Sequence, residues 1–535
     1  MRLLLPAAAL ALTTICLQSG GPGAGVLPVV RAQGARTVAV ISDLHLGVGM
    51  DPATRQWHPA EDFRWGDALK SFLRQADETG RGATDLVIDG DAFELLTSLL
   101  PGCRPENPRA GCTEAEALAR LDRVLAAHAG EVADIGAFAK NRDNRVVFVP
   151  GDHDAALLFP SVAARVVAAV AAPGRVSVPA KGYWLSADGS VYAEHGHQVA
   201  NDPYRFEAWP EPFVRAGGAT RLERTWGEAL IQDIYDRHES AYPILDNVAE
   251  EGGGVKYLAS ADPTAITGAQ LGPLLKFFLS RHAWQQFRPE LDGGDVEPPL
   301  WDLAAIRKAG KTFLFESLPA DDRLRERVER AVKEDGFAVG LDELSDAQIV
   351  AVCDYRAAVR RSRRRLERSF TQLISAGPPG AECPRLPDTR GPEFEYFLRS
   401  RDAETTAHLA AVRATLAKDG RQTDNLKVVV FGHRHLPDEG FVPVKGAAAP
   451  LVLNAGAWQR TVTPFQLNDV ATARMWSDAD VLRRLTPEDL PACYGVVWIQ
   501  PPAVPRFRFW RGNGTWGNLP RDAGGFANAC TGGGP

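Results

Sequence analysis

The chain has 535 residues, of which 45% are hydrophobic and 24% are charged, and its formal net charge is −7. This length exceeds what one hydrophobic core usually supports, so we expect one large domain with an insertion or a second domain. The net negative charge argues against a general affinity for nucleic acids, and a nucleic-acid partner is therefore not expected.

The N-terminal segment MRLLLPAAALALTTICLQSG has one early arginine and then an apolar run of the length found in signal peptides. Small residues around Ala32 offer a cleavage site, so we predict a signal peptide over residues 1–32. A lipoprotein signal is the weaker interpretation, because Ile15 rather than a small residue precedes Cys16. No uncharged run of about 18 residues recurs later, so we expect an exported protein, periplasmic or extracellular, without a membrane-spanning segment after cleavage.

Six cysteines remain after this cleavage, and an even number in an exported chain favours disulfides. Proximity along the chain favours three pairs: Cys103 with Cys112, Cys353 with Cys383, and Cys493 with Cys530. The alternative is a set of free, buried cysteines. No CxxC pair occurs, so the sequence does not predict a zinc site made of thiolates.

Apolar, strand-like runs cluster in two regions of the chain. The first region contains such runs at 37–47, 85–96, 145–157 and 181–198. The last run carries an Asp-Gly pair between two β-rich stretches, which predicts a hairpin. Helix-like, alanine-rich stretches at 114–140 and 161–172 lie between the early strands. The second region contains strand-like runs at 426–435, 449–458, 494–500 and 506–512. This alternation predicts an α/β sheet domain.

Between the two regions, apolar residues recur at the three- and four-residue spacing of helices. We therefore predict a helical insertion over 205–424. The core that carries it is expected over 33–204 and 425–515, and a flexible tail over 516–535.

Acidic and histidine side chains directly follow five of the predicted strands. They are Asp43 and His45, then Asp91 and Glu94, then Asp152 and His153, then His195 and His197, and finally His433 and His435. Residues two apart in a strand share one face, so Asp43 and His45 are expected to point the same way. Because parallel strands bring their carboxyl ends to one edge, all these side chains are expected to converge there.

Carboxylates gathered in one crevice repel each other, and burial makes them more costly unless cations neutralise them. Imidazole and carboxylate ligands together suit zinc, iron or manganese. Each motif alone is weak, since single histidines at strand ends are more often surface or core residues. Five in succession, each after an apolar strand, predict a metal site.

The five motifs resemble those of the calcineurin-like metallophosphoesterases. The matching segments are Asp43-Leu-His45, Gly90-Asp91-Ala-Phe-Glu94, Gly151-Asp152-His153-Asp154, His195-Gly-His197 and Gly432-His433-Arg-His435. The resemblance covers about 37–200 and 425–510 and leaves the insertion unmatched. It implies a four-layer α/β/β/α sandwich with a large helical insertion and two metal ions, divalent or mixed-valence, of Mn, Fe or Zn.

The resemblance also implies a set of ligands. The first ion would be held by Asp43, His45 and His435, the second by Asp152, His195 and His433, and Asp91 would bridge the two. The family pattern favours His195 over His197 as the ligand, which leaves His197 to support a ligand or to contact substrate. The family usually has asparagine where this chain has Asp152. Both side chains offer an oxygen, but the carboxylate adds a negative charge.

The activity that the resemblance implies is hydrolysis of a phosphate mono- or diester by a metal-bridging hydroxide. His153 would then protonate the leaving oxygen as general acid, with Glu94 orienting its imidazole. The alternative is that His153 only contacts the phosphate. Arg205 is a further candidate for contact with the substrate.

The insertion is far longer than an ordinary loop, and we expect it to cap the metal edge and select a small phosphoester. The alternative from another class is a catalytically inactive phosphoesterase-fold scaffold that binds partners. Competent donors at all seven ligand positions favour the enzyme. A nuclease is disfavoured by the net charge and by the lack of a basic, aromatic groove pattern.

Overall fold

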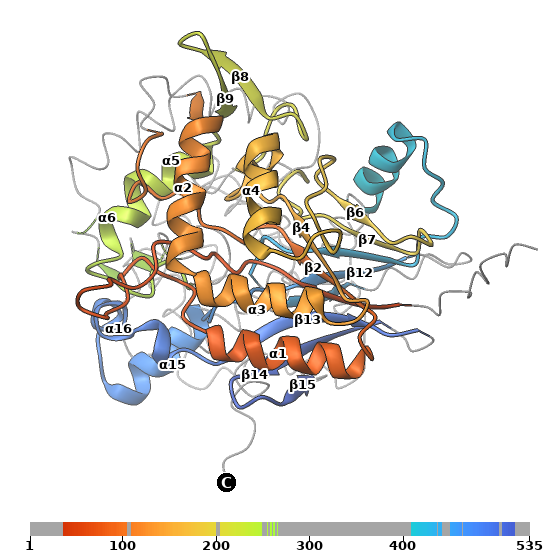
Figure 1. Ribbon diagram of the computed structural model, residues 1–535. Coiled ribbons are helices and arrows are strands. Elements are labelled where there is room, and N and C mark those ends of the chain that lie inside the picture. Colours follow the sequence, from red (N-terminus) through yellow and green to blue (C-terminus); the bar gives the residue numbers. More distant parts are fainter. Residues whose placement is uncertain are drawn as a thin grey trace, which may run out of the picture. The chain divides into compact units, whose positions relative to one another are not determined.

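The computed structural model describes residues 36–103, 109–199, 204–248, six positions between 254 and 265, 408–435, 437–440, 450–462, 464–501 and 505–518. These residues form a mixed α/β structure with a seven-stranded, a five-stranded and a three-stranded sheet (Figure 1). The predicted signal peptide and most of the predicted insertion lie outside the described residues.

The seven-stranded sheet has the strand order β15-β14-β13-β1-β2-β4-β5. Its strands are β1 Thr37–Ile41, β2 Thr84–Asp89, β4 Arg145–Val149, β5 Val176–Ser177, β13 Cys493–Ile499, β14 Arg506–Arg511 and β15 Trp516–Asn518. The first four are parallel, and β13 to β15 are antiparallel. β1 and β2 are rich in Val and Ile and fully buried, as parallel strands covered on both faces usually are.

The flexible tail predicted over 516–535 begins too early, because residues 516–518 form β15, which still pairs with β14.

The five-stranded sheet has the order β11-β12-β10-β7-β6. Its strands are β6 Trp184–Leu185, β7 Val191–Ala193, β10 Val428–Phe431, β11 Pro437–Gly440 and β12 Leu451–Ala455. The hairpin predicted from Asp188-Gly189 is confirmed, since β6 and β7 pair antiparallel and Gly189 has φ of 71°. β7, β10 and β12 run parallel, which brings two distant regions of the chain together.

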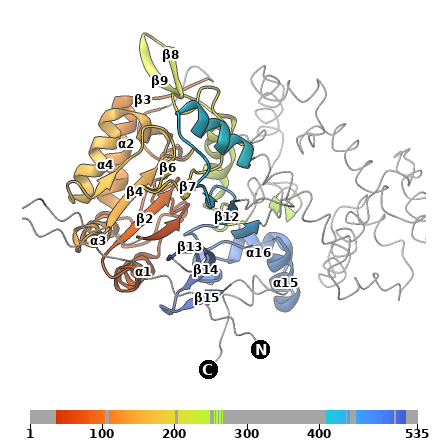
Figure 2. The same ribbon diagram turned by 90° about the vertical axis from the view of Figure 1, so that its right-hand side faces the viewer.

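Four helices pack on one face of the seven-stranded sheet (Figure 2). They are α1 Gly66–Thr79, α2 Glu114–Ala127, α3 Ala129–Lys140 and α4 Pro160–Val170. The predicted helix over 114–140 is thus two helices, separated at His128 by a non-helical backbone with φ of −111° and ψ of 34°. Thr113 caps α2, because its side chain accepts a hydrogen bond from the Glu116 N–H and the Glu116 carboxylate accepts one from the Thr113 N–H.

The opposite face of this sheet shares one apolar cluster with the five-stranded sheet. Val40 and Val87 from β1 and β2 belong to the same cluster as Val191, Val430 and Leu453. The other face of the five-stranded sheet packs against helical residues 408–418, which contribute Val412 and Leu416. Each of the two larger sheets therefore buries apolar side chains on both faces.

The beginning of the predicted helical insertion is not helical. β8 Phe213–Ala216 and β9 Ala219–Glu223 form a hairpin that pairs with β3 Ala110–Thr113. Its turn is the pair Gly217-Gly218, and both glycines have positive φ, a combination that suits two-residue hairpin loops. The helical prediction is wrong for this stretch because the spacing of Leu222 and its neighbours was assigned to a helix, whereas pairing with a distant strand decides the structure.

The next described part of the insertion is helical, as predicted. It contains α5 Trp226–Leu230, a π-helical turn Ile231–Tyr235 and α6 Asp236–His238. Leu230 and Ile234 share an apolar cluster with Leu467 and Leu482. The last two come from α15 Pro464–Arg474 and α16 Asp478–Arg484. This part of the insertion is therefore packed against the second part of the core.

One of the predicted disulfides is confirmed. Cys103 and Cys112 are bonded, nine residues apart, and both are buried. Cys353, Cys383 and Cys530 lie outside the described residues. Because disulfides persist in oxidising compartments, this bond hints that the protein resides in an oxidising compartment. None of the helices in the described part of the chain has the length and hydropathy needed to cross a membrane.

Candidate metal centre

The candidate ligands lie in loops just after strands, rather than on the strands themselves. β1 ends at Ile41 and β10 at Phe431, before their motifs. Positive φ values between 50° and 70° occur at Asp43, His45, Asp91, His433 and His435. The expectation that the pairs follow strand alternation is therefore wrong. Non-glycine residues in this region cost on the order of 1–3 kcal/mol each and gather at functional sites, where the surrounding structure holds them.

Backbone hydrogen bonds hold the loops after β1 and β2 side by side. The Asp43 N–H donates to Gly90 O at 3.2 Å, and the His45 N–H donates to Asp91 O at 2.9 Å. The Ser42 hydroxyl donates to Asp89 O at 2.7 Å. These bonds fix the two turns that present the first candidate ligands.

Asp154 ties the loop after β4 to the loop after β2. Its fully buried carboxylate accepts hydrogen bonds from the Gly151 N–H at 2.7 Å and from the Ala92 N–H at 2.8 Å. Asp154 is the last residue of the Gly151-Asp152-His153-Asp154 motif, and no role was predicted for it from the sequence. Its position identifies it as a positioning residue, because it connects the segments that carry Asp91 and Asp152.

Two motif glycines stand where other residues approach their Cα atoms too closely for a side chain. A Cβ at Gly432 would lie 1.8 Å from Ser42 Oγ, and one at Gly151 would lie 2.1 Å from Asp91 Oδ1. Any larger residue would therefore push the loops apart. The glycines of these motifs serve close packing of the loops that carry the candidate ligands.

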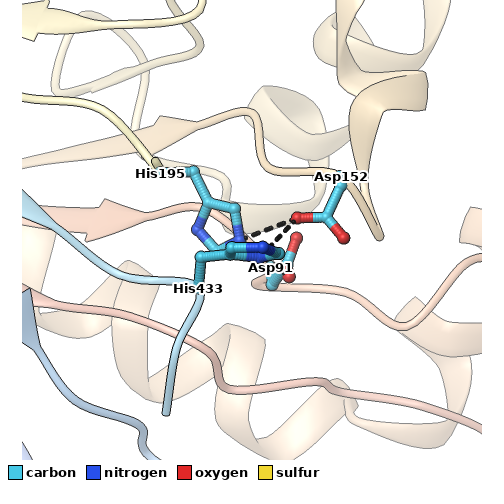
Figure 3. A group of neighbouring side chains, drawn as sticks. All are labelled: Asp91, Asp152, His195 and His433. Carbon is cyan, nitrogen blue, oxygen red and sulfur yellow. Dashed lines mark ion pairs between the residues drawn. The ribbon is translucent and has the colours of Figure 1, made fainter. Parts of the chain in front are cut away.

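One group of candidate ligands comprises Asp91, Asp152, His195 and His433, all buried (Figure 3). His195 Nε2 lies 2.9 Å from Asp91 Oδ2 and 3.0 Å from Asp152 Oδ1. His433 Nδ1 lies 3.1 Å from the same Asp152 oxygen. One ligand atom from each residue lies within 4.8 Å of the others, so the group could hold a metal ion.

A second group comprises Asp43, His45 and His435. Asp43 Oδ1 lies 3.3 Å from His435 Nε2 and 3.8 Å from His45 Nε2. The groups adjoin, because His45 Nε2 also lies 3.7 Å from Asp91 Oδ2. The structure thus brings together all seven residues that were predicted from the sequence to hold two ions. They lie in loops that follow strands of both larger sheets.

The chemistry of the donor atoms fits metal ions. Asp43 Oδ1, His45 Nε2, His195 Nε2 and both carboxylate oxygens of Asp152 are buried, and none of their contacts with described residues has the geometry of a hydrogen bond, although some are as short as 2.9–3.0 Å. Buried polar atoms normally have partners, and a group without one is costly. Imidazole nitrogens and carboxylate oxygens are the donors that zinc, iron and manganese take.

Positive charge stabilises the group formed by Asp91, Asp152, His195 and His433. Burial alone raises the pKa of Asp152, but His433 and His195 outweigh it and lower that pKa well below the ordinary value. Conversely, burial lowers the pKa of His195, but Asp91 and Asp43 raise it well above the ordinary value. The carboxylates therefore attract whatever cations are present, whether protons on the imidazoles or metal ions.

His153 and Glu94 form a buried pair beside the two groups. Glu94 Oε2 contacts His153 Nδ1 and lies 3.2 Å from His45 Nδ1. Burial lowers the pKa of His153, but the charges of Glu94 and Asp91 outweigh it and raise the pKa to about 10. His45, Glu94 and His153 together form a third set of donors that could hold an ion. The Tyr204 ring stacks on His153 with centroids 5.5 Å apart.

The two predicted substrate contacts have different positions. His197 is buried, with Nδ1 3.9 Å from Asp152 Oδ1, and its ring packs edge-on against Trp209. Burial holds the pKa of His197 well below the ordinary value, so its neutral form is favoured. Arg205, in contrast, has an exposed side chain.

Comparison with protein-family models, with curated proteins and with solved structures finds no match to this chain. The residues themselves show an α/β structure with buried aspartate and histidine groups that could hold metal ions.

Proposed function

We propose that the chain is a dinuclear-metal phosphoesterase that hydrolyses a small phosphate mono- or diester. One observation carries this proposal. Two groups of Asp and His donors lie next to each other: His45 Nε2 of one group is 3.7 Å from Asp91 Oδ2 of the other. Adjacent metal sites of this kind suit the displacement of an oxygen at phosphorus, because they can stabilise both the attacking and the leaving oxygen.

The same proposal includes a four-layer α/β/β/α arrangement. Its support is the packing described above, in which the helices α1 to α4, the two larger sheets and the helical residues 408–418 share successive apolar clusters. We also propose that the protein acts in an exported, oxidising environment, with the Cys103–Cys112 disulfide as the support.

In the proposed enzyme the seven donors divide as the two groups do. One ion would be held by Asp43, His45 and His435 and the other by Asp152, His195 and His433, and Asp91 contacts donors of both groups. When bound, such ions supply an activated water for in-line attack and neutralise charge on the phosphoryl oxygens. Mn, Fe and Zn all match these donors.

His153 has the position required of the group that protonates the leaving oxygen. Its Nδ1 is engaged by Glu94, so its Nε2 is directed elsewhere, 3.6 Å from Asp152 Oδ2. Glu94 is itself held by N–H groups of Leu96 and Thr97, at 2.8 and 3.0 Å. An imidazole fixed on one nitrogen can deliver the proton from the other to an oxygen in the centre.

The experiment that tests this function combines metal analysis with hydrolysis of p-nitrophenyl phosphate and bis(p-nitrophenyl) phosphate. We expect purified protein to carry about two transition-metal ions per chain, and chelation to abolish hydrolysis that added metal restores. Asp122→Asn is the matched control, since Asp122 is exposed and pairs with Arg165 on the surface. Protein that binds no transition metal under any loading condition would contradict the proposal.

A further inference from the structure

Tyr204 is a buried residue that directly precedes the insertion, and its ring lies against the candidate general acid. It is 3% exposed, and its ring stacks on the His153 imidazole with centroids 5.5 Å apart and planes 21° apart. Aromatic rings favour such an offset, nearly parallel arrangement over a direct sandwich. The proposed mechanism has so far given Tyr204 no role.

The His153 imidazole has three neighbours that restrict its orientation. Glu94 contacts Nδ1, the Tyr204 ring stacks on the imidazole, and the His45 ring packs edge-on against it with centroids 4.5 Å apart. A contact at Nδ1 alone leaves the imidazole free to tilt about that contact. Stacking against a flat ring opposes the tilt, because tilting separates the two rings. Tyr204 therefore helps to fix the imidazole plane, and with it the direction of Nε2.

The insertion packs directly against the Tyr204 ring. A Cβ at Gly227, in α5, would lie 2.1 Å from both Cδ1 and Cε1 of Tyr204. The helix backbone therefore lies against the ring, and any larger residue at this position would displace it. Glycine ordinarily weakens a helix, so its presence here serves this close approach. Tyr204 also shares an apolar cluster with Trp226 and Leu230 of the same helix.

The same helical segment of the insertion also holds the loop that carries Glu94. Its Gln232 amide donates to Leu96 O at 2.7 Å, and its Asp236 carboxylate accepts a hydrogen bond from the Thr97 hydroxyl at 2.7 Å. Both bonds reach the loop whose backbone N–H groups bind the Glu94 carboxylate. One segment of the insertion is therefore attached to two of the partners that restrain the imidazole.

We propose that Tyr204 is a positioning residue for the general acid, and that the insertion holds it on the His153 imidazole through Gly227. The proposal rests on the proposed function for the role of His153 itself. It gives the insertion a part in protonating the leaving oxygen, in addition to the cap that its length predicts. This part is played by packing, and Tyr204 exchanges no proton.

A positioning role of this kind has a specific kinetic consequence. Transfer of a proton requires the donor nitrogen to face the leaving oxygen at hydrogen-bond distance, so a tilted imidazole delivers the proton poorly. Esters with poorly acidic leaving groups need that proton, whereas p-nitrophenyl esters do not. Loss of the Tyr204 ring should therefore slow the first kind of ester more than the second. A general loss of stability would slow both kinds equally.

Three variants of the full chain test the proposal. Tyr204→Leu removes the ring but keeps an apolar side chain, Tyr204→Phe keeps the ring, and Gly227→Ala places a methyl group against it. The first control is Gly130→Ala in α3, where a Cβ would meet no atom within 4 Å. The second control is Tyr183→Leu, which removes another buried ring, stacked on Tyr192 with centroids 5.0 Å apart.

The measurements are kcat over a series of aryl and alkyl phosphates, metal content by mass spectrometry, and crystal structures of the Tyr204 variants. We expect Tyr204→Leu and Gly227→Ala to lose about tenfold more rate on alkyl esters than on p-nitrophenyl phosphate, with metal content unchanged. Tyr204→Phe should stay within about twofold of wild type on every ester, and neither control should change the dependence on the leaving group. The crystal structure of Tyr204→Leu should show a displaced His153 imidazole, and that of Tyr204→Phe the wild-type orientation.

An unmoved imidazole in Tyr204→Leu, or an equal loss of rate on all esters, would overturn the proposal. An equal loss together with lost metal would assign Tyr204 instead to the support of His433, whose ring it contacts edge-on with centroids 5.8 Å apart. Equal losses in Tyr204→Leu and Tyr204→Phe would overturn it in favour of the hydroxyl. If Tyr204→Leu does not fold, wild-type rates in folded Gly227→Ala would overturn it. Wild-type protein that binds metal but hydrolyses no ester would refute the proposed function, whereas the orientation of His153 in the crystal structures would still decide whether Tyr204 positions it.

Discussion

His45 and Asp91 follow different strands, yet His45 Nε2 lies 3.7 Å from Asp91 Oδ2. The same Asp91 oxygen lies 2.9 Å from His195 Nε2, which belongs to the other group of donors and follows a strand of the other sheet. Asp91 is therefore one side chain through which the two groups adjoin, and a second contact runs from Asp43 Oδ1 to His195 Nε2 at 3.9 Å. A carboxylate in this position can neutralise cations in both.

The first prediction concerns this shared carboxylate. Asp91→Asn removes one negative charge from both groups, so we expect weaker metal binding at each and a fall in kcat/KM of about 100-fold or more. Metal content by mass spectrometry after dialysis and hydrolysis of p-nitrophenyl phosphate provide the measurements. Retention of two ions with normal activity in Asp91→Asn, alongside a normal Asp122→Asn control, would show that Asp91 is no ligand.

The second prediction concerns protonation of the leaving group. His153→Ala should lower the rate by about 10²–10⁴-fold for esters with poorly acidic leaving groups and much less for p-nitrophenyl esters, because a good leaving group needs no proton. Glu94→Gln should show the same dependence in weaker form, since Glu94 only orients His153. Rates measured over a series of aryl and alkyl phosphates give the comparison. An equal loss on all esters would instead indicate that His153 only contacts the phosphate.

The third prediction concerns the charge that Asp152 adds. Its carboxylate contacts His195 Nε2 at 3.0 Å and His433 Nδ1 at 3.1 Å. Asp152→Asn keeps an oxygen donor but lowers the negative charge, so we expect increased activity on dianionic monoesters relative to diesters and weaker retention of ferric iron. Metal analysis measures how much iron is retained. The ratio of kcat/KM for a monoester to kcat/KM for a diester measures the substrate preference. If neither metal content nor substrate preference changes, the extra charge has no such role.

The fourth prediction concerns Arg120, a fully buried residue of α2 that holds the loop after Glu94. Its guanidinium donates to the carbonyl oxygens of Leu95 and Gly102 at 2.7 Å and of Thr97 at 3.0 Å. Lysine cannot reproduce this fork of donors, so Arg120→Lys should destabilise the fold by about 3 kcal/mol and displace Glu94. Urea unfolding measures the first effect, and the leaving-group dependence of the rate measures the second. Unchanged unfolding would mean that the carbonyls find other donors.

The fifth prediction concerns pH. His128 lies between α2 and α3, with Nε2 3.3 Å from Glu61 Oε1. Burial lowers the pKa of His128, but Glu61 and Glu131 outweigh it and raise the pKa to about 9. The folded state therefore holds this proton more tightly than the unfolded chain, where the pKa is near 6.5. The resulting stability is complete below about pH 6.5 and is lost as the pH rises through about 9.

The corresponding measurement is the free energy of unfolding at about pH 6 and about pH 10 in wild type and in His128→Gln. Wild type should lose on the order of 3 kcal/mol more than the variant over this interval. The difference between the two proteins isolates His128 from other groups that titrate in the same range. Parallel pH dependence in both proteins would contradict the assignment.

The strands that carry the candidate ligands could be predicted from the sequence, because their signals are local. Runs rich in Val and Ile, such as β1 Thr37–Ile41 and β10 Val428–Phe431, are buried strands, and Asp188-Gly189 is the hairpin turn. The hairpin at Gly217-Gly218 was missed although the pair of glycines indicates it. Its partner strand β3 lies far away in the chain, so the spacing of its side chains alone was misleading.

The order and chemical type of the donor side chains are properties of the sequence: Asp and His residues after successive apolar strands imply a need for cations wherever those strands meet. Which atoms meet depends on the packing of the two sheets and on turns with positive φ, as in the approach of His45 to Asp91. The physical reason is that side-chain type is encoded residue by residue, whereas distance between segments results from the burial of many side chains together.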